Sequence, residues 1–157
     1  MPPRIETRVC LIRHELRDSF RVMEPTANEY AEIARRQGVV LLYLFGSRAK
    51  GGAASDSDWD FAALFEASPG TDLLPRAAAV EIDLLKHFEE PVEVTPLNEA
   101  DPVLRFEVIS TGQIVYARSE RERVLFDAAV QREYQDSNER RRIYRDANRR
   151  YFMRSDP

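Results

Sequence analysis

Two short apolar runs on either side of a polar stretch constrain the fold of this chain more than any other feature. Residues 39–45 are seven consecutive apolar residues, and residues 59–65 form a second run that contains one carboxylate, Asp60. Runs of this length are too short to cross a bilayer, and their β-branched and aromatic content is typical of buried strands. The sequence therefore predicts two buried strands with a polar connection between them.

The polar connection opens with a turn suited to binding an anion. Directly after the first run the chain reads Gly46, Ser47, Arg48, Ala49, Lys50 and Gly51. Glycine lets a ligand come close to the backbone, and Ser47 offers a hydroxyl and an N–H group where a helical turn can begin. Arg48 and Lys50 add positive charge nearby. We expect this turn to bind phosphate, with a plain turn that ends the strand as the alternative.

The second apolar run begins with a carboxylate pair, Asp58 and Asp60. Two carboxylates two residues apart on a strand point to the same face, where they can share a divalent cation. Without a partner they would be costly in a buried strand, and a metal ion relieves that cost. Turn or N-cap residues are the alternative reading. Asp56 forms a second possible Asp-x-Asp pair with Asp58. Only the pair that begins at Asp58 follows the Gly-Ser pair after ten intervening residues.

This order of motifs resembles the signature of the DNA polymerase β-like nucleotidyltransferase superfamily. The Gly-Ser-Arg-Ala-Lys-Gly turn is similar to that of its minimal nucleotidyltransferase (MNT) branch. The resemblance covers residues 39–117 and includes the block Leu104, Arg105, Phe106 and Glu107. It implies an α/β (α+β) nucleotidyltransferase fold: a mixed β-sheet with helices packed mainly on one face, plus a long C-terminal helix. Ordinary ion pairing is the simpler expectation for Arg105 and Glu107.

The resemblance also implies a metal site and a nucleotide substrate. A third carboxylate on a later strand completes the metal site of the superfamily, and Glu93 is the natural candidate here. The implied ligands of Mg²⁺ are Asp58, Asp60 and Glu93, and ATP is the implied substrate, with its phosphates bound by Gly46, Ser47, Arg48 and Lys50. Mg²⁺ agrees with a donor set of hard oxygen atoms.

Glu93 departs from the pattern of the superfamily, which more usually has aspartate at this position. Its flanking valines, Val92 and Val94, place Glu93 on the opposite face of a strand, as a ligand requires. The extra methylene group displaces the carboxylate, and a misplacement of ~1 Å can cost about 100-fold in rate. A base toward the attacking hydroxyl or a metal ligand is one role for Glu93, and an exposed edge-strand glutamate is the alternative.

Composition limits the remaining classes of protein. The 157 residues suffice for one compact domain, and the single cysteine, Cys10, excludes an intramolecular disulfide framework. The sequence has no apolar span of 18 residues and no apolar leader, so we expect a cytoplasmic protein without a membrane partner. The two histidines, His14 and His87, are too few for a zinc site or a Ser-His-Asp triad to be built easily.

Helical periodicity and breakers organise the rest of the chain. We expect an N-terminal helical segment (1–38), a nucleotidyltransferase core (39–117) and a C-terminal helical extension (118–157). Apolar spacing predicts an amphipathic helix over 5–23, with Val9, Ile12, Leu16 and Phe20 on one face. Further helices are predicted from Thr26 to Gly38, after Asp72, and over 101–110, with a last strand at 114–117. The helix after Asp72 is expected to present Leu74, Ala78, Ile82, Leu85 and Phe88 on one face.

The C-terminal extension differs in charge from the rest of the chain. Residues 118–154 contain eleven arginines and seven acidic residues, against a net charge of −4 for the whole chain. Apolar residues near helical spacing predict one long helix, with a possible break at Ser137 and Asn138. A solvated helix lying across its own domain is the simplest interpretation. Docking to a partner protein is the alternative, and direct nucleic-acid binding is disfavoured because acidic residues interrupt the basic face.

The resemblance to the MNT family implies a specific function. It implies the antitoxin of a HEPN/MNT toxin–antitoxin system, which transfers AMP from ATP to a tyrosine of its cognate HEPN ribonuclease and so silences it. One alternative is a catalytically impaired antitoxin that neutralises its partner by occlusion, which the glutamate at position 93 favours. Another is a stand-alone enzyme that modifies a small-molecule hydroxyl, such as that of an antibiotic.

Overall fold

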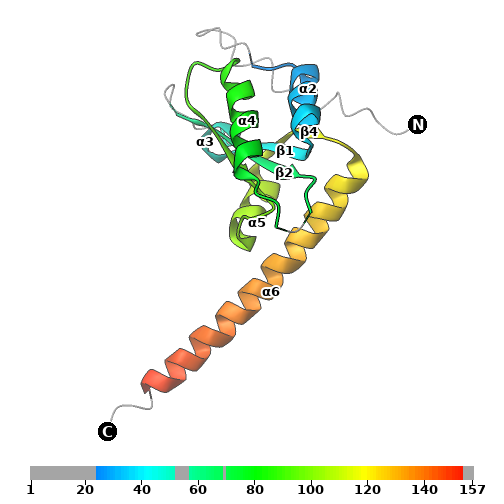
Figure 1. Cartoon of the computed structure of the whole chain (residues 1–157). Coiled ribbons are helices and arrows are strands. Elements are labelled where there is room, and N and C mark those ends of the chain that lie inside the picture. Colours follow the sequence, from blue (N-terminus) through cyan, green and yellow to red (C-terminus); the bar gives the residue numbers. More distant parts are fainter. Residues whose placement is uncertain (1–23, 52–56, 69, 154–157) are drawn as a thin grey trace, which may run out of the picture.

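The computed structural model describes residues 24–51, 57–68 and 70–153, and only the backbone of residues 143–153. The helix expected over 5–23 therefore lies outside the described residues. Figure 1 shows the elements, which in chain order are α2 (Ala27–Gln37), β1 (Val39–Phe45), α3 (Gly46–Ala49), β2 (Trp59–Phe65), α4 (Leu74–Leu85), β3 (Val92–Pro96), α5 (Pro102–Thr111), β4 (Gln113–Ala117) and α6 (Glu120–Met153).

The four strands form one mixed sheet in the order β3-β2-β1-β4. The two apolar runs, β1 and β2, lie at its centre and pair antiparallel, with Phe45 opposite Asp60. β4 pairs antiparallel with the other side of β1, and β3 pairs parallel with β2. A parallel pair needs a long crossover, which α4 supplies between β2 and β3. The predicted fold class, a mixed sheet with helices and a long C-terminal helix, is confirmed.

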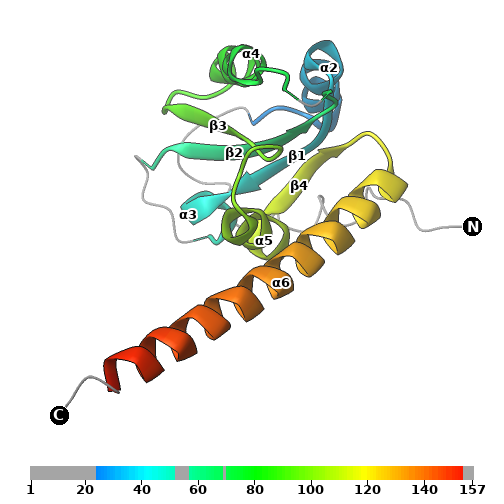
Figure 2. The same cartoon turned by 60° about the horizontal axis from the view of Figure 1, so that its bottom comes forward.

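Helices cover both faces of the sheet, as Figure 2 shows. α2 and α4 lie on one face, and their buried side chains join those of β1, β2 and β3 in one core cluster. α5 and the first part of α6 lie on the other face, where Val108 and Phe126 pack against a second cluster. The helices are thus distributed more evenly over the two faces than expected, because α5 joins the C-terminal helix on the second face.

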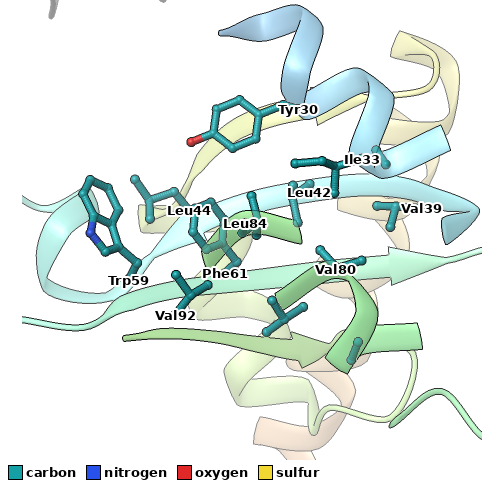
Figure 3. Packing of buried hydrophobic residues seen from close by; sticks show 14 of the residues in the cluster. Tyr30, Ile33, Val39, Leu42, Leu44, Trp59, Phe61, Val80, Leu84 and Val92 are labelled. Carbon is teal, nitrogen blue, oxygen red and sulfur yellow. The ribbon is translucent and has the colours of Figure 1, made fainter. Parts of the chain in front are cut away.

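The core beneath α2 and α4 combines aliphatic side chains with a group of aromatic rings, as Figure 3 shows from close by. Phe61 is fully buried at the centre of this cluster, and its ring lies 6.2 Å from that of Tyr30 and 5.9 Å from that of Phe88. Trp59 packs 4.2 Å from Phe88 and is also buried. Burying rings of this size supplies much of the hydrophobic free energy that holds helices to a sheet. Trp59, at the start of β2, is therefore part of this core.

The predicted ends of α2 are confirmed by the hydrogen bonds there. Thr26 and Glu29 form a reciprocal capping box at the N-terminus, which satisfies two otherwise unpaired N–H groups. At the other end, Gly38 adopts a left-handed conformation with φ of 62° and ends the helix immediately before β1. Arg76 of α4 donates hydrogen bonds to the carbonyls of Gln37 and Gly38, so the α2–β1 turn is also held by α4.

The buried face of α4 differs from the predicted one. The expected face of Leu74, Ala78, Ile82 and Leu85 is exposed to solvent among the described residues, and only Phe88, just beyond the helix, is buried. The residues that α4 buries against the sheet are instead Leu73, Ala77, Val80 and Leu84. Both sets have helical spacing, so periodicity alone could not distinguish them. The prediction was wrong because the helix carries two apolar stripes.

α6 is one continuous helix, without the break considered at Ser137 and Asn138. Its first part lies across the second face of the sheet, where Val130 is fully buried and the ring of Tyr134 stacks 4.0 Å from Phe106. Figures 1 and 2 show the rest of α6 extending away from the body of the protein. None of the helices in the described part of the chain has the length and apolar character that crossing a membrane requires.

The contact of α6 with the body can be tested with two valines of the same helix. Val130 is 1% exposed and Val124 is 51% exposed. We expect Val130→Ala to lower the free energy of unfolding by about 1.5–3 kcal/mol, since it removes buried methyl groups and leaves a cavity. Val124→Ala is expected to change it by less than about 0.5 kcal/mol. Urea unfolding midpoints measure both; equal effects would contradict the observed packing of α6.

Candidate active site

The turn after β1 is built against the second carboxylate of the Asp-x-Asp pair. Gly46 begins α3 with φ of 73°, a left-handed conformation that favours glycine. A Cβ atom added at Gly46 would lie 2.3 Å from Oδ2 of Asp60. A larger residue at position 46 would therefore displace the Asp60 carboxylate. The structure thus places the predicted anion-binding turn directly beside Asp60, the second carboxylate of the pair.

Two of the predicted phosphate-binding residues are exposed on the single turn of α3. Ser47 is exposed at its start, and Lys50 is exposed just after its end. The Nζ atom of Lys50 lies 3.1 Å from Oε1 of Glu107 on α5, an ion pair in which both side chains are about half exposed. Because an exposed ion pair of this kind is weak, it leaves Lys50 able to exchange Glu107 for a phosphate group. Gln113 of β4 donates a hydrogen bond of 2.9 Å to the carbonyl of Ala49, which fixes α3 to the sheet.

Arg48 points toward the protein, where it holds the segment that precedes β2. Its Nε atom donates a hydrogen bond of 2.7 Å to the carbonyl of Ser57. The guanidinium group lies 4.2 Å from the centre of the Trp59 ring and 3.5 Å from the carboxylate of Glu90. These contacts fix the backbone next to Asp58, since Ser57 and Trp59 are its two neighbours. The structure therefore assigns Arg48 a positioning role, and direct phosphate binding by Arg48 stays a prediction.

The three predicted carboxylates are coupled electrostatically at Asp60. Burial raises the pKa of the Asp60 carboxyl, and the charges of Glu93 and Asp58 raise it further, whereas Arg48 lowers it. Asp60 is half-buried, while Asp58 and Glu93 are exposed at the protein surface. A carboxyl whose pKa is raised by neighbouring negative charges marks a site short of positive charge.

The register of the parallel strand pair brings Glu93 to Asp60. The two residues are direct partners across β2 and β3, so they lie on the same face of the sheet. Their neighbours Phe61 and Val94 point into the core beneath α2 and α4, so Asp60 and Glu93 point to the opposite face. The expectation that Glu93 faces away from its flanking valines is confirmed.

The chemistry of these residues suits a hard divalent cation. Carboxylate oxygens are the preferred ligands of Mg²⁺, and the raised pKa of Asp60 indicates a repulsion that a cation would remove. Within 24–51, 57–68 and 70–153, however, no group of three or more His, Cys, Asp or Glu side chains is arranged to hold a metal ion. The three carboxylates therefore suit Mg²⁺ in their chemistry and charge, and strand register brings Glu93 beside Asp60. Their oxygen atoms do not converge on one point.

The downstream block at 104–107 links α5 to both ends of the sheet, with Glu107 at the end of the α3 turn and Arg105 at the end that follows β3. Arg105 donates hydrogen bonds of 2.8 Å to the carbonyl of Leu97 and 2.6 Å to that of Asn98, and it pairs with Glu133 of α6. Glu107 pairs with Lys50, as described above. The expectation that Arg105 and Glu107 form ordinary ion pairs is confirmed. Their effect is to hold α5 between α3 and α6.

Sequence reasoning missed one residue of this region, Glu90. Its carboxylate accepts a hydrogen bond of 3.0 Å from Nε1 of Trp59 and pairs with Arg48. The hydrogen bond from Trp59 lowers the pKa of Glu90 most, and the charge of Arg48 lowers it further. The only signal in the sequence is an acidic residue directly before the β3 segment. Its partners become visible only once β3 is known to lie parallel to β2.

Comparison with known proteins assigns the family. The sequence pattern of the family described as polymerase beta, nucleotidyltransferase matches residues 28–121, which is more than half of the chain. The chain belongs to this nucleotidyltransferase family. The match includes the α3 turn, the Asp58 and Asp60 pair and Glu93. No curated protein matches the chain.

Solved structures of similar fold come from toxin–antitoxin complexes. A chain of a toxin–antitoxin complex with AMP-PNP aligns with a TM-score of 0.65 at 23% identity, covering 78% of this chain and 98% of that one. A chain of the complex of a tri-AMPylated HEPN toxin with its MNT antitoxin from Shewanella oneidensis aligns with a TM-score of 0.59 at 22% identity, covering 77% and 93%. At these identities the likeness confirms the nucleotidyltransferase fold.

Two glycines test the contact between the α3 turn and Asp60. Gly46 and Gly51 have nearly equal φ angles, 73° and 72°, but a Cβ at Gly51 meets no atom within 4 Å. Alanine at either position pays the same backbone strain of about 1 kcal/mol. We expect only Gly46→Ala to weaken nucleotide binding, by tenfold or more, because only its methyl group displaces Asp60. Calorimetric titration with AMP-PNP and Mg²⁺ measures this; equal losses in both variants would contradict a specific role for the Gly46–Asp60 contact.

The charge repulsion at Asp60 predicts a gain of stability when that charge is removed. A pKa raised by folding favours the folded state at low pH, and this contribution is lost as the pH rises through the raised pKa. We therefore expect Asp60→Asn to unfold at higher urea concentration than the wild type at pH 7, by at most about 1 kcal/mol because solvent screens the site. The difference should shrink toward pH 4. Asp136→Asn, at an exposed position of α6, is the control and should leave the pH profile unchanged.

Proposed function

We propose that this chain is a nucleotidyltransferase antitoxin that transfers AMP from ATP to a tyrosine hydroxyl of a HEPN-type toxin. The observation that carries the proposal is the contact of Gly46 with Asp60, where an exposed anion-binding turn meets a carboxylate that two further carboxylates repel. Such a site combines groups for phosphate with groups for a cation and a base. These are the requirements of nucleotidyl transfer.

The proposed transfer is an in-line substitution at the α-phosphorus of ATP. The phenolic oxygen of the acceptor tyrosine forms a bond to the α-phosphorus of ATP. The bond from that phosphorus to the oxygen that bridges to the β-phosphorus breaks, and pyrophosphate leaves with its electron pair. The phenolic proton passes to a carboxylate of the site. The product is a phosphodiester that joins AMP to the tyrosine.

The described residues divide these tasks among themselves. Ser47 and Lys50, exposed on the α3 turn, bind the departing phosphates. Asp58 and Asp60 hold Mg²⁺, and Glu93, the strand partner of Asp60, either completes this set or accepts the phenolic proton. When bound, Mg²⁺ lowers the pKa of the attacking hydroxyl and offsets the charge of the phosphates. Arg48 positions Asp58 from behind through the carbonyl of Ser57.

The comparisons and the C-terminal helix support a protein as the acceptor. The neighbouring structures include a toxin–antitoxin complex with AMP-PNP and a HEPN toxin that carries three AMP groups in complex with its MNT antitoxin. The described part of this chain has one nucleotidyltransferase core and no second domain to bind a small acceptor. α6 extends away from the body and offers a surface on which a partner protein can dock (Figure 1).

The second candidate function is neutralisation by binding alone. Glu93 is exposed, and the described residues gather no group of three ligands for a metal ion. A longer side chain at this position can leave the site unable to align the attacking oxygen. The protein would then inhibit its toxin by covering it, without transfer of AMP.

Labelled ATP separates these two functions. The protein is incubated with the protein encoded by the adjacent gene, which the proposal expects to be a HEPN-type toxin, together with Mg²⁺ and ATP labelled at the α-phosphate. We expect the label on a toxin tyrosine, located by mass spectrometry. Asp58→Asn and Asp60→Asn should each reduce transfer by at least about 100-fold, since each removes a charge that acts in the transition state.

Two substitutions at Glu93 separate the presence of its negative charge from the position of that charge. Glu93→Asp should retain or raise transfer, whereas Glu93→Gln should lose it, if Glu93 acts in the reaction. Asp136→Asn on α6 should leave transfer unchanged. A toxin that is bound and inhibited but remains unlabelled by the wild-type protein would refute transfer and support inhibition by binding.

A further inference from the structure

α4 carries an apolar stripe that nothing in the described part of the chain covers. Leu74 is 65% exposed, Ile82 is 61% exposed and Leu85 is 42% exposed, and Ala78 lies between them on the same face. Their spacing of four, four and three residues forms one continuous row along the helix. Single exposed apolar residues are common, but a continuous row is typical of a surface that contacts something. We call these four residues the α4 stripe.

The α4 stripe does not belong to the active site. α4 lies on the face of the sheet that it shares with α2, whereas Asp60 and Glu93 point to the opposite face. The stripe also points away from α2, because the α2 side of the helix is taken by Asp83, which pairs with Arg36 of α2. The segment or partner that covers the α4 stripe is therefore neither the nucleotide nor α2.

The first 23 residues of the chain have a matching apolar pattern. Their apolar positions repeat at intervals of four or three residues, at Ile5, Val9, Ile12, Leu16, Phe20 and Met23. Four arginines occupy positions between them, as expected for the polar face of an amphipathic helix. From Val9 to Phe20 this pattern covers the same number of residues as the α4 stripe. Two helical rows of this length each extend about 16 Å.

The point where the described chain begins fits this occupant. Hydrogen bonds from Thr26 lower the pKa of Glu29 in the first turn of α2, and the charge of His87, just beyond the end of α4, also acts on it. At the other end of the pair, Arg76 near the start of α4 donates a hydrogen bond to the carbonyl of Gln37 at the end of α2. α2 therefore runs antiparallel to α4, and the chain enters α2 near the C-terminal end of α4.

The connection is long enough to reach the far side of α4. A helix on the α4 stripe and α2 would lie on two sides of α4, each about 10 Å from its axis. Residues 21–26 can cover about 20 Å when extended. A helix that ends at Phe20 can thus lie along α4 in the same direction, with Phe20 near Leu85 and Val9 near Leu74.

We propose that residues 9–20 form an amphipathic helix that docks on the α4 stripe of the same chain. A tethered segment competes at an effective concentration in the millimolar range, well above that of a second copy in dilute solution. The docked helix buries the apolar rows of both partners and extends the layer formed by α2 and α4. This proposal is independent of the proposed function, since it uses neither the nucleotide nor the toxin.

Trypsin tests the proposal on the full-length protein, because Arg8, Arg13 and Arg17 lie within or next to the docked stretch. Cleavage of a docked helix requires its release, so its rate follows the population of the open form. We expect Ile82→Asp to accelerate cleavage at these arginines by at least about tenfold relative to the wild type. Leu125→Asp, the same type of change at a 58% exposed position of α6, is the matched control and should leave the rate unchanged.

A reciprocal variant and a measurement of mass complete the test. Phe20→Asp, which leaves α4 intact, should accelerate the same cleavages as Ile82→Asp does. Equal rates in wild type, Ile82→Asp and Phe20→Asp would overturn the proposal. Sedimentation would then identify a second copy as the occupant if wild type is a dimer that Ile82→Asp dissociates. Protection of Ile82 from hydrogen–deuterium exchange only when toxin is added would identify the toxin instead, and would equally overturn docking in cis.

Discussion

The antiparallel pairing of β1 with β2 is the constraint on which the rest of this site depends. It sets Phe45 opposite Asp60, so the turn that follows β1 must pass beside that carboxylate. Gly46 is the residue that permits this, because a side chain there would collide with Oδ2 of Asp60. The predicted phosphate-binding turn and the carboxylates are therefore brought together by strand register, and neither could move without breaking the central ladder of the sheet.

The parallel strand β3 adds the third carboxylate at an energetic cost. Its register places Glu93 beside Asp60, and the mutual repulsion raises the pKa of Asp60 in the absence of a cation. Structural residues around the site compensate with ordinary packing and pairing. Arg48 joins Trp59 and Glu90 in one cluster behind the site. The protein thus keeps a repulsive group of charges at the surface and secures it from the buried side, an arrangement expected of functional sites.

The sequence predicted the strands and the helix caps more reliably than the packing of the helices. The apolar runs that form β1 and β2, and the caps at Thr26 and Gly38, follow from local pattern alone and were found as expected. The buried face of α4 was predicted wrongly, since Leu74 and Leu73 each begin an apolar row with helical spacing. Local periodicity cannot choose between two rows, because the choice is made by the surface on which the helix packs.

By itself, the sequence determined the family and the order of its motifs, and it predicted which three carboxylates form the site. These depend on residue type and spacing, which a chain carries before it folds. Only the tertiary structure decided that Arg48 turns inward to Glu90, that Glu93 stands beside Asp60, and that α4 leaves one apolar row exposed. Each of these depends on which strands pair and in which register. Such pairing joins residues far apart along the chain, and so no local pattern encodes it.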